Sequence, residues 1–305
     1  MSQFAAEVLR YEDRVVAFVD ILGWKNAVLG DGVNKARTAD ELGWLLQIFL
    51  QQERSASAAS ESTKKFRRLD SSSDFPPFNF PRITQFSDCI VISTPASDSP
   101  DDYWTFNDTL HRLCALACQN GFLLRGGVAR GAICHLDRIV YGPALVEAYE
   151  IEKYISIYPR IVVSKELISI LYPGARYFEN GKYVGHGKYW RRDVDGMVFF
   201  DYLAPIHVIV DISNKKKRIA RSGINILDNY KKVICQGIIS NPHESRVLEK
   251  YYWTSRYFDK ALKEYPNERL TYTVVKAGEH LIAYDRDEWP HWRPDRNDSE
   301  SPNSD

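Results

Sequence analysis

Residues 14–23 have the sequence RVVAFVDILG, and this stretch does most to decide the fold. Its apolar run from Val15 to Val19 is typical of a strand that is buried on both faces. The run ends at Asp20, and a turn containing Gly23 follows. A carboxylate directly after a buried strand is costly unless it is paired or bound to a metal ion. Asp20 is therefore a candidate functional residue, and an aspartate that merely caps the turn is the alternative.

A second acid stands at a comparable position further along the chain. Residues 82–94, RITQFSDCIVIST, predict two strands with Ser87 and Asp88 at the bend between them. Asp88 follows Asp20 by 88 − 20 = 68 residues, so only the fold can bring the two carboxylates together. Facing carboxylates repel each other, and divalent cations remove that cost. A site for Mg²⁺ or Mn²⁺ is the functional interpretation, and a second turn cap is the alternative.

Composition narrows the possible function classes. The 40 basic and 40 acidic residues give a net charge of zero, which argues against a nucleic-acid coat or a polybasic membrane anchor. No apolar run is long enough for a transmembrane helix, and the first residues carry no apolar secretory signal, so we expect no membrane insertion. The 5 cysteines form no CxxC pair, which favours reduced thiols and a cytoplasmic location.

The other segments alternate between helical and extended patterns. Helical spacing covers residues 34–53 and 101–120, and a strand with three glycines covers 122–135, where a close backbone approach or a bulge is expected. Further expected elements are a short strand at 160–164 and a hairpin over 182–203 with Asp195-Gly196 at its tip.

This order predicts an α/β domain with additions. The domain spans residues 1–205 and contains a serine-rich, mobile insert at 54–74. A helical extension spans 206–284 and is broken at Asn241-Pro242. Residues 285–305 are rich in Asp, Pro, Arg and Ser, and predict a disordered tail.

Four motifs follow one another on these elements. They are FVDILGWK at 18–25, QFSDCIVIS at 85–93, LLRGGVARGA at 123–132 and YGPALVEAYEIE at 141–152. With these motifs the chain resembles the class III nucleotidyl cyclases, and more closely the pyrimidine cyclases of bacterial Pycsar antiphage defence. The resemblance extends over residues 12–203. It implies a mixed, mainly antiparallel sheet flanked by helices, with a C-terminal α-helical hairpin extension.

The resemblance also implies a metal and triphosphate site. The acids of the family's first two motifs hold two metal ions, and the matching residues are Asp20 and Asp88. Two Mn²⁺ or Mg²⁺ ions per active site are implied, with the backbone carbonyl of Ile21 as a further ligand. Backbone N–H groups of the following turn would bind the triphosphate, because turn amides that point one way attract anions. The residues implied for this role are Leu22, Gly23 and Trp24, and Lys188, on the predicted hairpin, corresponds to a triphosphate-binding lysine of the purine cyclases.

The positions that read the base depart from the purine-cyclase pattern. Where purine cyclases commonly carry a lysine and an acid, this chain has Thr84 and Ile139. A site that lacks the polar partners of a purine rejects purines, so a pyrimidine substrate is expected. Phe49, on the predicted 34–53 helix, is a candidate for narrowing the pocket, and plain core packing is the alternative.

The fourth motif departs from the family as well. The family's asparagine and arginine correspond to Val146 and Glu150 in this chain. Arg125 and Arg130 are the candidate catalytic replacements, because a guanidinium matches the geometry of a phosphate. Solvated arginines on a half-exposed strand are the alternative interpretation.

The resemblance thus implies a uridylate cyclase that converts UTP to 3′,5′-cyclic UMP and pyrophosphate. It further implies a homodimer with active sites at the interface, and a separate cyclic-nucleotide-sensing effector in phage defence.

A cytidylate cyclase acting on CTP is one alternative. A catalytically silent nucleotide-binding module is another, favoured by Val146 and Glu150 and opposed by the two retained acids. A two-metal nuclease would need more acids and a basic groove, and the neutral charge balance offers little support for one.

Overall fold

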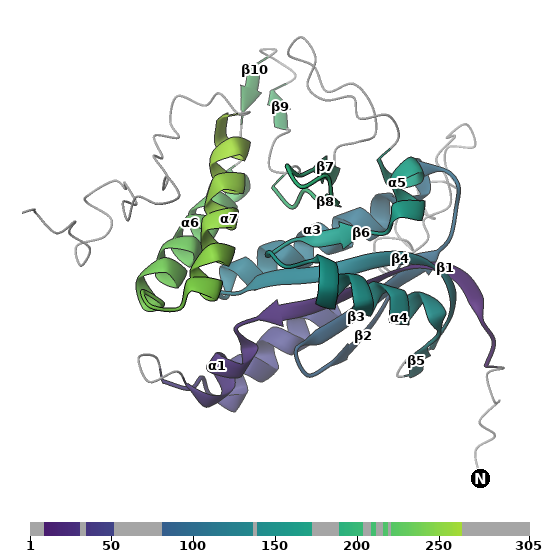
Figure 1. Ribbon diagram of the computed structural model, residues 1–305, viewed down its shortest axis with the longest axis horizontal. Coiled ribbons are helices and arrows are strands. Elements are labelled where there is room, and N and C mark those ends of the chain that lie inside the picture. Colours follow the sequence, from purple (N-terminus) through teal and green to yellow (C-terminus); the bar gives the residue numbers. More distant parts are fainter. Residues whose placement is uncertain are drawn as a thin grey trace, which may run out of the picture. The chain divides into compact units, whose positions relative to one another are not determined.

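The computed structural model describes residues 9–30, 35–51, 81–136, 139–172, 189–203, 209–211, 216–218 and 221–263 (Figure 1). The chain divides into two compact units, Met1–Val233 and Ile234–Asp305, and each is described by itself. The domain limits expected at residues 205 and 284 stay predictions. The 54–74 insert, Lys188 and the 285–305 tail lie outside the described residues.

The first unit is built on an eight-stranded sheet with the order β2-β3-β1-β4-β6-β8-β7, and β5 pairs with β4 beside this path. β4 and β6 run parallel, whereas the other strand pairs described in this sheet are antiparallel. The predicted mixed, mainly antiparallel sheet is therefore confirmed. Its strands are β1 (Glu12–Leu22), β2 (Arg82–Phe86), β3 (Cys89–Pro95), β4 (Leu123–Leu136), β5 (Ile139–Tyr141), β6 (Ile161–Val163), β7 (Trp190–Arg192) and β8 (Val198–Phe200).

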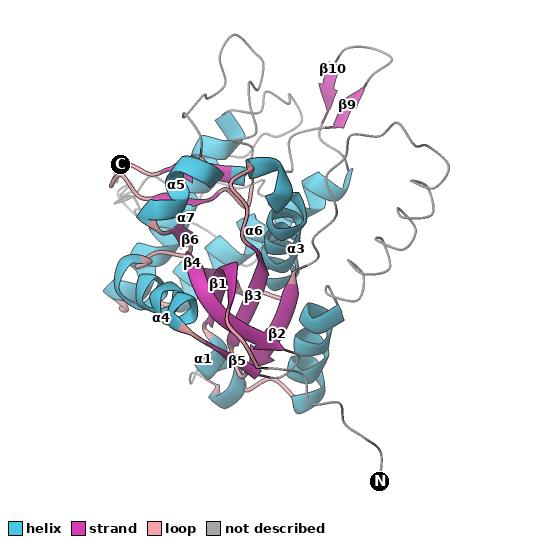
Figure 2. Ribbon diagram, turned by 90° about the vertical axis from the view of Figure 1, so that its right-hand side faces the viewer, coloured by secondary structure: helices cyan, strands magenta, loops and turns pink. Residues whose placement is uncertain are grey.

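Helices flank this sheet, with α4 (Pro143–Glu150) on one side and α3 (Trp104–Gln119) on the other (Figure 2). The predicted helix at 101–120 is confirmed, and it ends where Gly121 takes a positive φ of 83°. The remaining elements described in this unit are α1 (Trp24–Leu29), helical residues 39–51, the 3₁₀-helix η1 (Pro100–Tyr103), the π-helix η2 (Ile151–Ile155), α5 (Lys165–Leu171), and a separate two-stranded sheet of β9 (Ile209–Asp211) and β10 (Lys216–Arg218).

β1 is an interior strand of the sheet, because it pairs with β3 on one side and with β4 on the other. Val15, Val16 and Val19 are fully buried. Successive residues of a strand point to opposite faces, so the adjacent pair Val15 and Val16 is buried on both. The strand predicted from RVVAFVDILG is confirmed, together with its burial on both faces.

Two glycines of β4 allow other backbone segments to approach closely. A Cβ atom added at Gly126 would lie 2.5 Å from the carbonyl oxygen of Phe18, and one added at Gly127 would lie 2.2 Å from that of Ala148. Both distances are far below a van der Waals contact, so only glycine fits at these positions. The close approach expected from the glycine-containing strand is confirmed, and at Gly127 it allows α4 to lie directly on β4.

A buried arginine fastens the hairpin of β7 and β8. Arg160 is 1% exposed and donates hydrogen bonds to the carboxylates of Asp193 and Asp195 in the turn. Burial of Asp195 favours its neutral form, but the hydrogen bonds from Arg160 and from backbone N–H groups outweigh this and lower its pKa. A buried charge requires such partners. The predicted turn at Asp195-Gly196 is confirmed, with a positive φ of 85° at Gly196.

Two long helices complete the described chain. They are α6 (Arg221–Ser240) and α7 (Ser245–Lys263), and the break between them at Asn241-Pro242 is the one predicted. Within the second unit they pack tightly, since a Cβ atom at Gly237 would lie 2.1 Å from the ring of Tyr251. None of the helices in the described part of the chain has the length and apolar character needed to cross a membrane.

Replacing Gly127 by alanine should destabilise the first unit by about 1–3 kcal/mol, the usual cost of overpacking, because the methyl group would collide with the backbone of α4. Gly43 on the 39–51 helix is the matched control, since nothing lies within 4 Å of a Cβ atom there. Gly43→Ala should leave stability unchanged or raise it by up to about 1 kcal/mol, as alanine favours helix. Urea denaturation of the two variants measures both effects. Equal stability of the two variants would contradict the packing of α4 on β4.

Candidate functional site

The structure brings Asp20 and Asp88 to the same end of β1 and β3. The antiparallel register of these strands pairs Asp20 with Cys89, the residue that follows Asp88. The backbone N–H of Ile21 donates to the carbonyl oxygen of Asp88 over 3.0 Å, which continues the ladder past the end of β3. Strand pairing thus bridges the 68 residues that separate the two acids along the chain.

The two carboxylates form a candidate metal site together with a thiol. One oxygen from Asp20, one from Asp88 and the Sγ atom of Cys89 all lie within 4.8 Å of one another, and all three residues are half-buried. Carboxylate oxygens suit Mg²⁺ and Mn²⁺, and a thiolate suits softer ions. The acids therefore fit the expected ions, and the nearby thiol is an addition that the sequence did not point to.

Cys89 is half-buried beside the two acids. Its burial, and after it the charges of Asp88, Asp20 and Glu152, together raise the pKa of its thiol to about 12. The Sγ atom lies 3.9 Å from Oδ1 of Asp88, within the range of a weak hydrogen bond from the thiol. The one sequence signal for Cys89 as a site residue was its position directly after Asp88. Such a position does not by itself distinguish a metal ligand from a core residue.

The tight turn between β2 and β3 presents Asp88. Only Ser87 and Asp88 connect the paired residues Phe86 and Cys89. Ser87 has a positive φ of 55°, which few residues other than glycine and asparagine adopt. The strained two-residue turn holds the Asp88 backbone against Ile21 and so keeps its carboxylate near Asp20.

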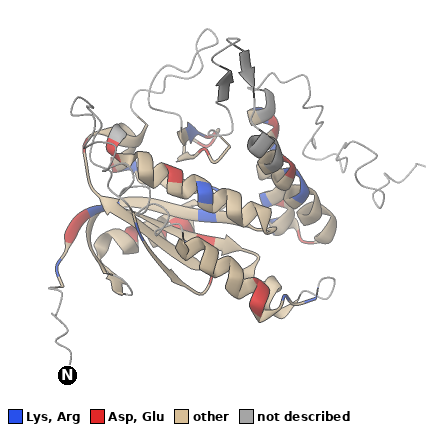
Figure 3. Ribbon diagram, turned by 180° about the vertical axis from the view of Figure 1, so that it is seen from behind, with Lys and Arg blue, Asp and Glu red and all other residues tan. Residues whose placement is uncertain are grey.

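Arg125 approaches Asp20 from β4, the strand that pairs with β1 on the side away from β3. The β1–β4 register pairs it with Asp20, and its Nη2 atom lies 3.4 Å from Oδ2 of that carboxylate. The same Nη2 atom also forms a shorter ion pair with Oε1 of Glu152 on η2. Most of the length of the strands is drawn as uncharged residues in Figure 3, and Asp20 and Arg125 are among the charged residues that β1 and β4 do carry.

Glu152 was not among the site residues predicted from the sequence, although it lies in the fourth motif. Its side chain is buried, with 6% exposed. It belongs to a π-helix, in which each N–H bonds five residues back; the N–H of Ser156 donates to the carbonyl oxygen of Ile151 over 2.8 Å. A helical pattern with 3.6 residues per turn gives the wrong face for a residue in such a turn, so the sequence pattern could not orient Glu152.

The turn expected to bind triphosphate follows directly on Asp20. Gly23 takes a positive φ of 86° at the start of α1, Trp24 is buried, and Leu22 is half-buried. Their backbone groups therefore adjoin the acids. Whether these amides bind phosphate stays a prediction.

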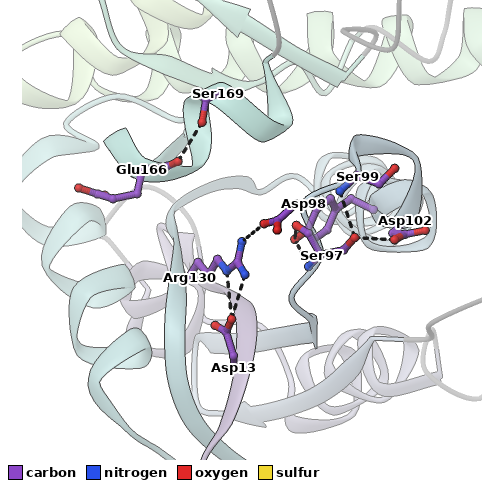
Figure 4. A network of polar contacts seen from close by, with 9 residues as sticks. Asp13, Ser97, Asp98, Ser99, Asp102, Arg130, Glu166 and Ser169 are labelled. Atoms are coloured by element: carbon purple, nitrogen blue, oxygen red, sulfur yellow. Dashed lines mark hydrogen bonds and ion pairs between the residues drawn. The ribbon is translucent and has the colours of Figure 1, made fainter.

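Arg130 lies elsewhere in the fold. It pairs with Val15, which precedes Asp20 by 20 − 15 = 5 residues on β1, a separation of about 17 Å along a strand. Its guanidinium bonds Asp13 over 3.0 Å and Asp98 over 2.7 Å (Figure 4). These two hydrogen bonds raise its pKa. The structure therefore separates the two candidate arginines and brings only Arg125 to the acids within one chain.

Thr84 lies in a buried polar network. Its Oγ1 atom lies 2.9 Å from Nε2 of His135, and Nδ1 of that ring lies 2.7 Å from Oγ of Ser93, which accepts a hydrogen bond from Arg14. Burial, and after it the nearby cations Arg14 and Arg82, together lower the pKa of His135 to about 4. The imidazole is therefore neutral at physiological pH, and it bonds a hydroxyl group at each nitrogen.

The other predicted residues have varied environments. Ile139 on β5 is about half exposed and pairs with Leu136. Phe49 is fully buried, which fits the core-packing alternative. Val146 and Glu150, where the family carries asparagine and arginine, are both exposed on α4.

Comparisons with known proteins give little further guidance. No protein-family model matches the sequence, and no curated protein matches it either. A solved structure of a bacterial light-regulated adenylyl cyclase is similar at a TM-score of 0.37 and 10% sequence identity. The match covers 73% of this chain and only 59% of that structure's length. Functional inference therefore rests on the motifs and on the geometry of the site.

His135 should make stability fall as the pH drops below neutrality. Its folded-state pKa of about 4 lies below the usual 6.5, so the unfolded chain takes up a proton before the folded chain does. From pH 7 to pH 5 this should cost about 2 kcal/mol of unfolding free energy. Urea denaturation at both pH values measures the loss.

A His135→Gln variant is the control, because glutamine takes up no proton. It should be less stable at pH 7 but should lose about 2 kcal/mol less between pH 7 and pH 5. An identical pH dependence in the two proteins would show that His135 is not held neutral by its burial.

Proposed function

We propose that this chain is a pyrimidine nucleotidyl cyclase that converts UTP to 3′,5′-cyclic UMP and pyrophosphate. The observation that carries the proposal is the convergence of Asp20 and Asp88 at the adjoining ends of β1 and β3. The two acids belong to the first two of the four cyclase-like motifs. Arg125, from the third motif, lies beside them.

The residues around the acids support each part of this chemistry. Asp20 and Asp88 would hold two Mn²⁺ or Mg²⁺ ions, with the carbonyl of Ile21 as a further ligand. When bound, the ions would lower the pKa of the ribose 3′-hydroxyl and offset the charge of the leaving pyrophosphate. The 3′-hydroxyl would give its proton to solvent, its oxygen would bond the α-phosphorus, and the bond from that phosphorus to the bridging oxygen would break to release pyrophosphate.

The remaining groups would position the triphosphate. The backbone N–H groups of Leu22, Gly23 and Trp24 would bind its oxygens, since they directly follow Asp20. Arg125 is the candidate cation for the α-phosphate because it adjoins Asp20. The two ion pairs of Arg130 with Asp13 and Asp98 argue against the same role for that residue.

The choice of base is proposed from what the two expected base-reading positions lack, as no contact of either with the acids is described. Thr84 carries no charge and is tied to the neutral ring of His135, and Ile139 is apolar. These residues offer no lysine and acid for a purine edge. The Thr84 hydroxyl can donate or accept, so it does not by itself separate UTP from CTP. A cytidylate cyclase is therefore the nearest alternative product.

A catalytically silent nucleotide-binding module is the second candidate function. Exposed Val146 and Glu150 favour it, because the family carries an asparagine and a phosphate-stabilising arginine at the matching positions. The retained pair Asp20 and Asp88 opposes it. The silent module would bind nucleotide and metal without releasing pyrophosphate.

The proposal includes a homodimer with sites at the interface and a role in phage defence through a separate effector. Exposed apolar side chains on α4 and η2, among them Val146, Tyr149 and Tyr154, would give a dimer apolar surface to bury. The effector and the defence role rest on the motif resemblance.

Incubation with each of the four ribonucleoside triphosphates and Mn²⁺ tests the function directly. Chromatography should show cyclic UMP as the main product, less cyclic CMP, and at least about tenfold less cyclic AMP or cyclic GMP, since each missing hydrogen bond to a buried partner costs about 1–3 kcal/mol. Equal turnover of ATP and UTP would refute the base assignment. Tight nucleotide binding with no cyclic product would favour the silent module.

Asp20→Asn and Asp88→Asn should each reduce turnover by at least about a thousandfold while leaving the protein folded, because the amide keeps the shape of the side chain and removes the charge that holds the cations. Asp108→Asn is the matched control, since Asp108 forms a surface pair with Arg112 on α3. It should retain full activity. Substantial cyclase activity in a folded Asp20→Asn protein would contradict the assignment of two metal ions to this site.

A further inference from the structure

We propose that Glu152 is a positioning residue that sets the charge of the Asp20 and Asp88 site by holding Arg125. The inference rests on the proposed function, because it concerns how the two acids take up divalent cations. Arg125 is itself a cation beside Asp20, so it competes with any metal ion there. Glu152 removes that competition by binding the guanidinium.

The geometry favours Glu152 as the main partner of Arg125. One nitrogen, Nη2, contacts both carboxylates, and its contact with Glu152 is the shorter of the two. Glu152 is also the more buried acid, with a side-chain exposure of 6% against 20% for Asp20. A buried carboxylate holds a guanidinium more strongly than a partly solvated one does.

The fold builds this contact through the close packing at Gly127. Arg125 and Gly127 are two residues apart on β4, so they point to the same face of the sheet. A Cβ atom at Gly127 would lie 2.7 Å from Cβ of Ile151, the first residue of η2. The π-helix therefore lies directly on this face, and Glu152, the next residue, reaches Arg125. π-helical turns recur at functional sites.

The summed charge of the four side chains affects how strongly the site attracts cations. Among these four side chains, the carboxylates of Asp20, Asp88 and Glu152 carry −3 and Arg125 carries +1, so their sum is −2. Glu152→Gln reduces this to −1 and leaves Asp20 as the remaining carboxylate partner of Arg125 among these four residues. Combining Glu152→Gln with Arg125→Gln restores −2 and removes the competing cation.

Mn²⁺ binding, measured by the electron paramagnetic resonance signal of the free ion, tests this without relying on activity. The Glu152→Gln protein should bind Mn²⁺ about tenfold more weakly than the unmodified chain. The double variant Arg125→Gln/Glu152→Gln should return to within about threefold of the unmodified chain. Glu150→Gln is the matched control, since Glu150 is exposed on α4 two residues away, and it should not change binding.

Any other binding result would contradict either the role of Glu152 or the metal site itself. Unchanged binding in Glu152→Gln would overturn the inference, and so would a double variant as weak as Glu152→Gln, because loss of structure is not repaired by a second substitution. If Glu152→Gln does not fold, the double variant decides alone, since it leaves neither partner of the buried ion pair charged. An unmodified chain that binds no Mn²⁺ would overturn the metal site of the proposed function itself.

Discussion

The pairing of β1 with its two neighbours is the constraint on which the site depends. The register with β3 sets Cys89 opposite Asp20, and the register with β4 sets Arg125 there. A slip of one residue would turn every side chain of β1 to the other face. The run from Val15 to Val19 is buried on both faces and does not by itself distinguish the two registers, whereas the buried hydrogen bonds from Arg14 to Ser93 hold β1 in this one. Strand register and site geometry thus have one origin.

Two arginines of this fold differ in the solvent exposure of their side chains, and therefore in how readily a ligand could reach them. Arg160 and Arg125 each bond two carboxylates. Arg160 is sealed in the interior, and its partners close the β7–β8 turn around it. The Arg125 side chain keeps 22% exposure, and of its two partners Asp20 is 20% exposed and Glu152 is 6% exposed. Burial of the Arg160 guanidinium makes it a fixed structural contact, whereas a ligand can reach the partly exposed guanidinium of Arg125.

The sequence predicted much of the fold and part of the site, and the division has physical causes. The run ending at Asp20, the bend at Ser87-Asp88 and the break at Asn241-Pro242 carry local signals, and these elements are confirmed. Arg125 and Arg130 look alike in sequence, because only strand register separates them. Glu152 escaped prediction because a π-helical turn shifts the phase of the helical pattern. Strand register and the π-helical turn both depend on tertiary contacts, which leave no periodic signal in the sequence.

The acids around Cys89 also bear on how the site withstands oxidants. Peroxide attacks the thiolate rather than the thiol, so the rate of sulfenic acid formation follows the fraction ionised. The raised pKa of about 12 keeps that fraction minute near neutral pH. A half-buried cysteine beside a reactive centre would ordinarily be the weak point of an enzyme under oxidative stress. Here burial, and after it the carboxylates that gather at the end of β1, keeps the sulfur in its less reactive thiol form.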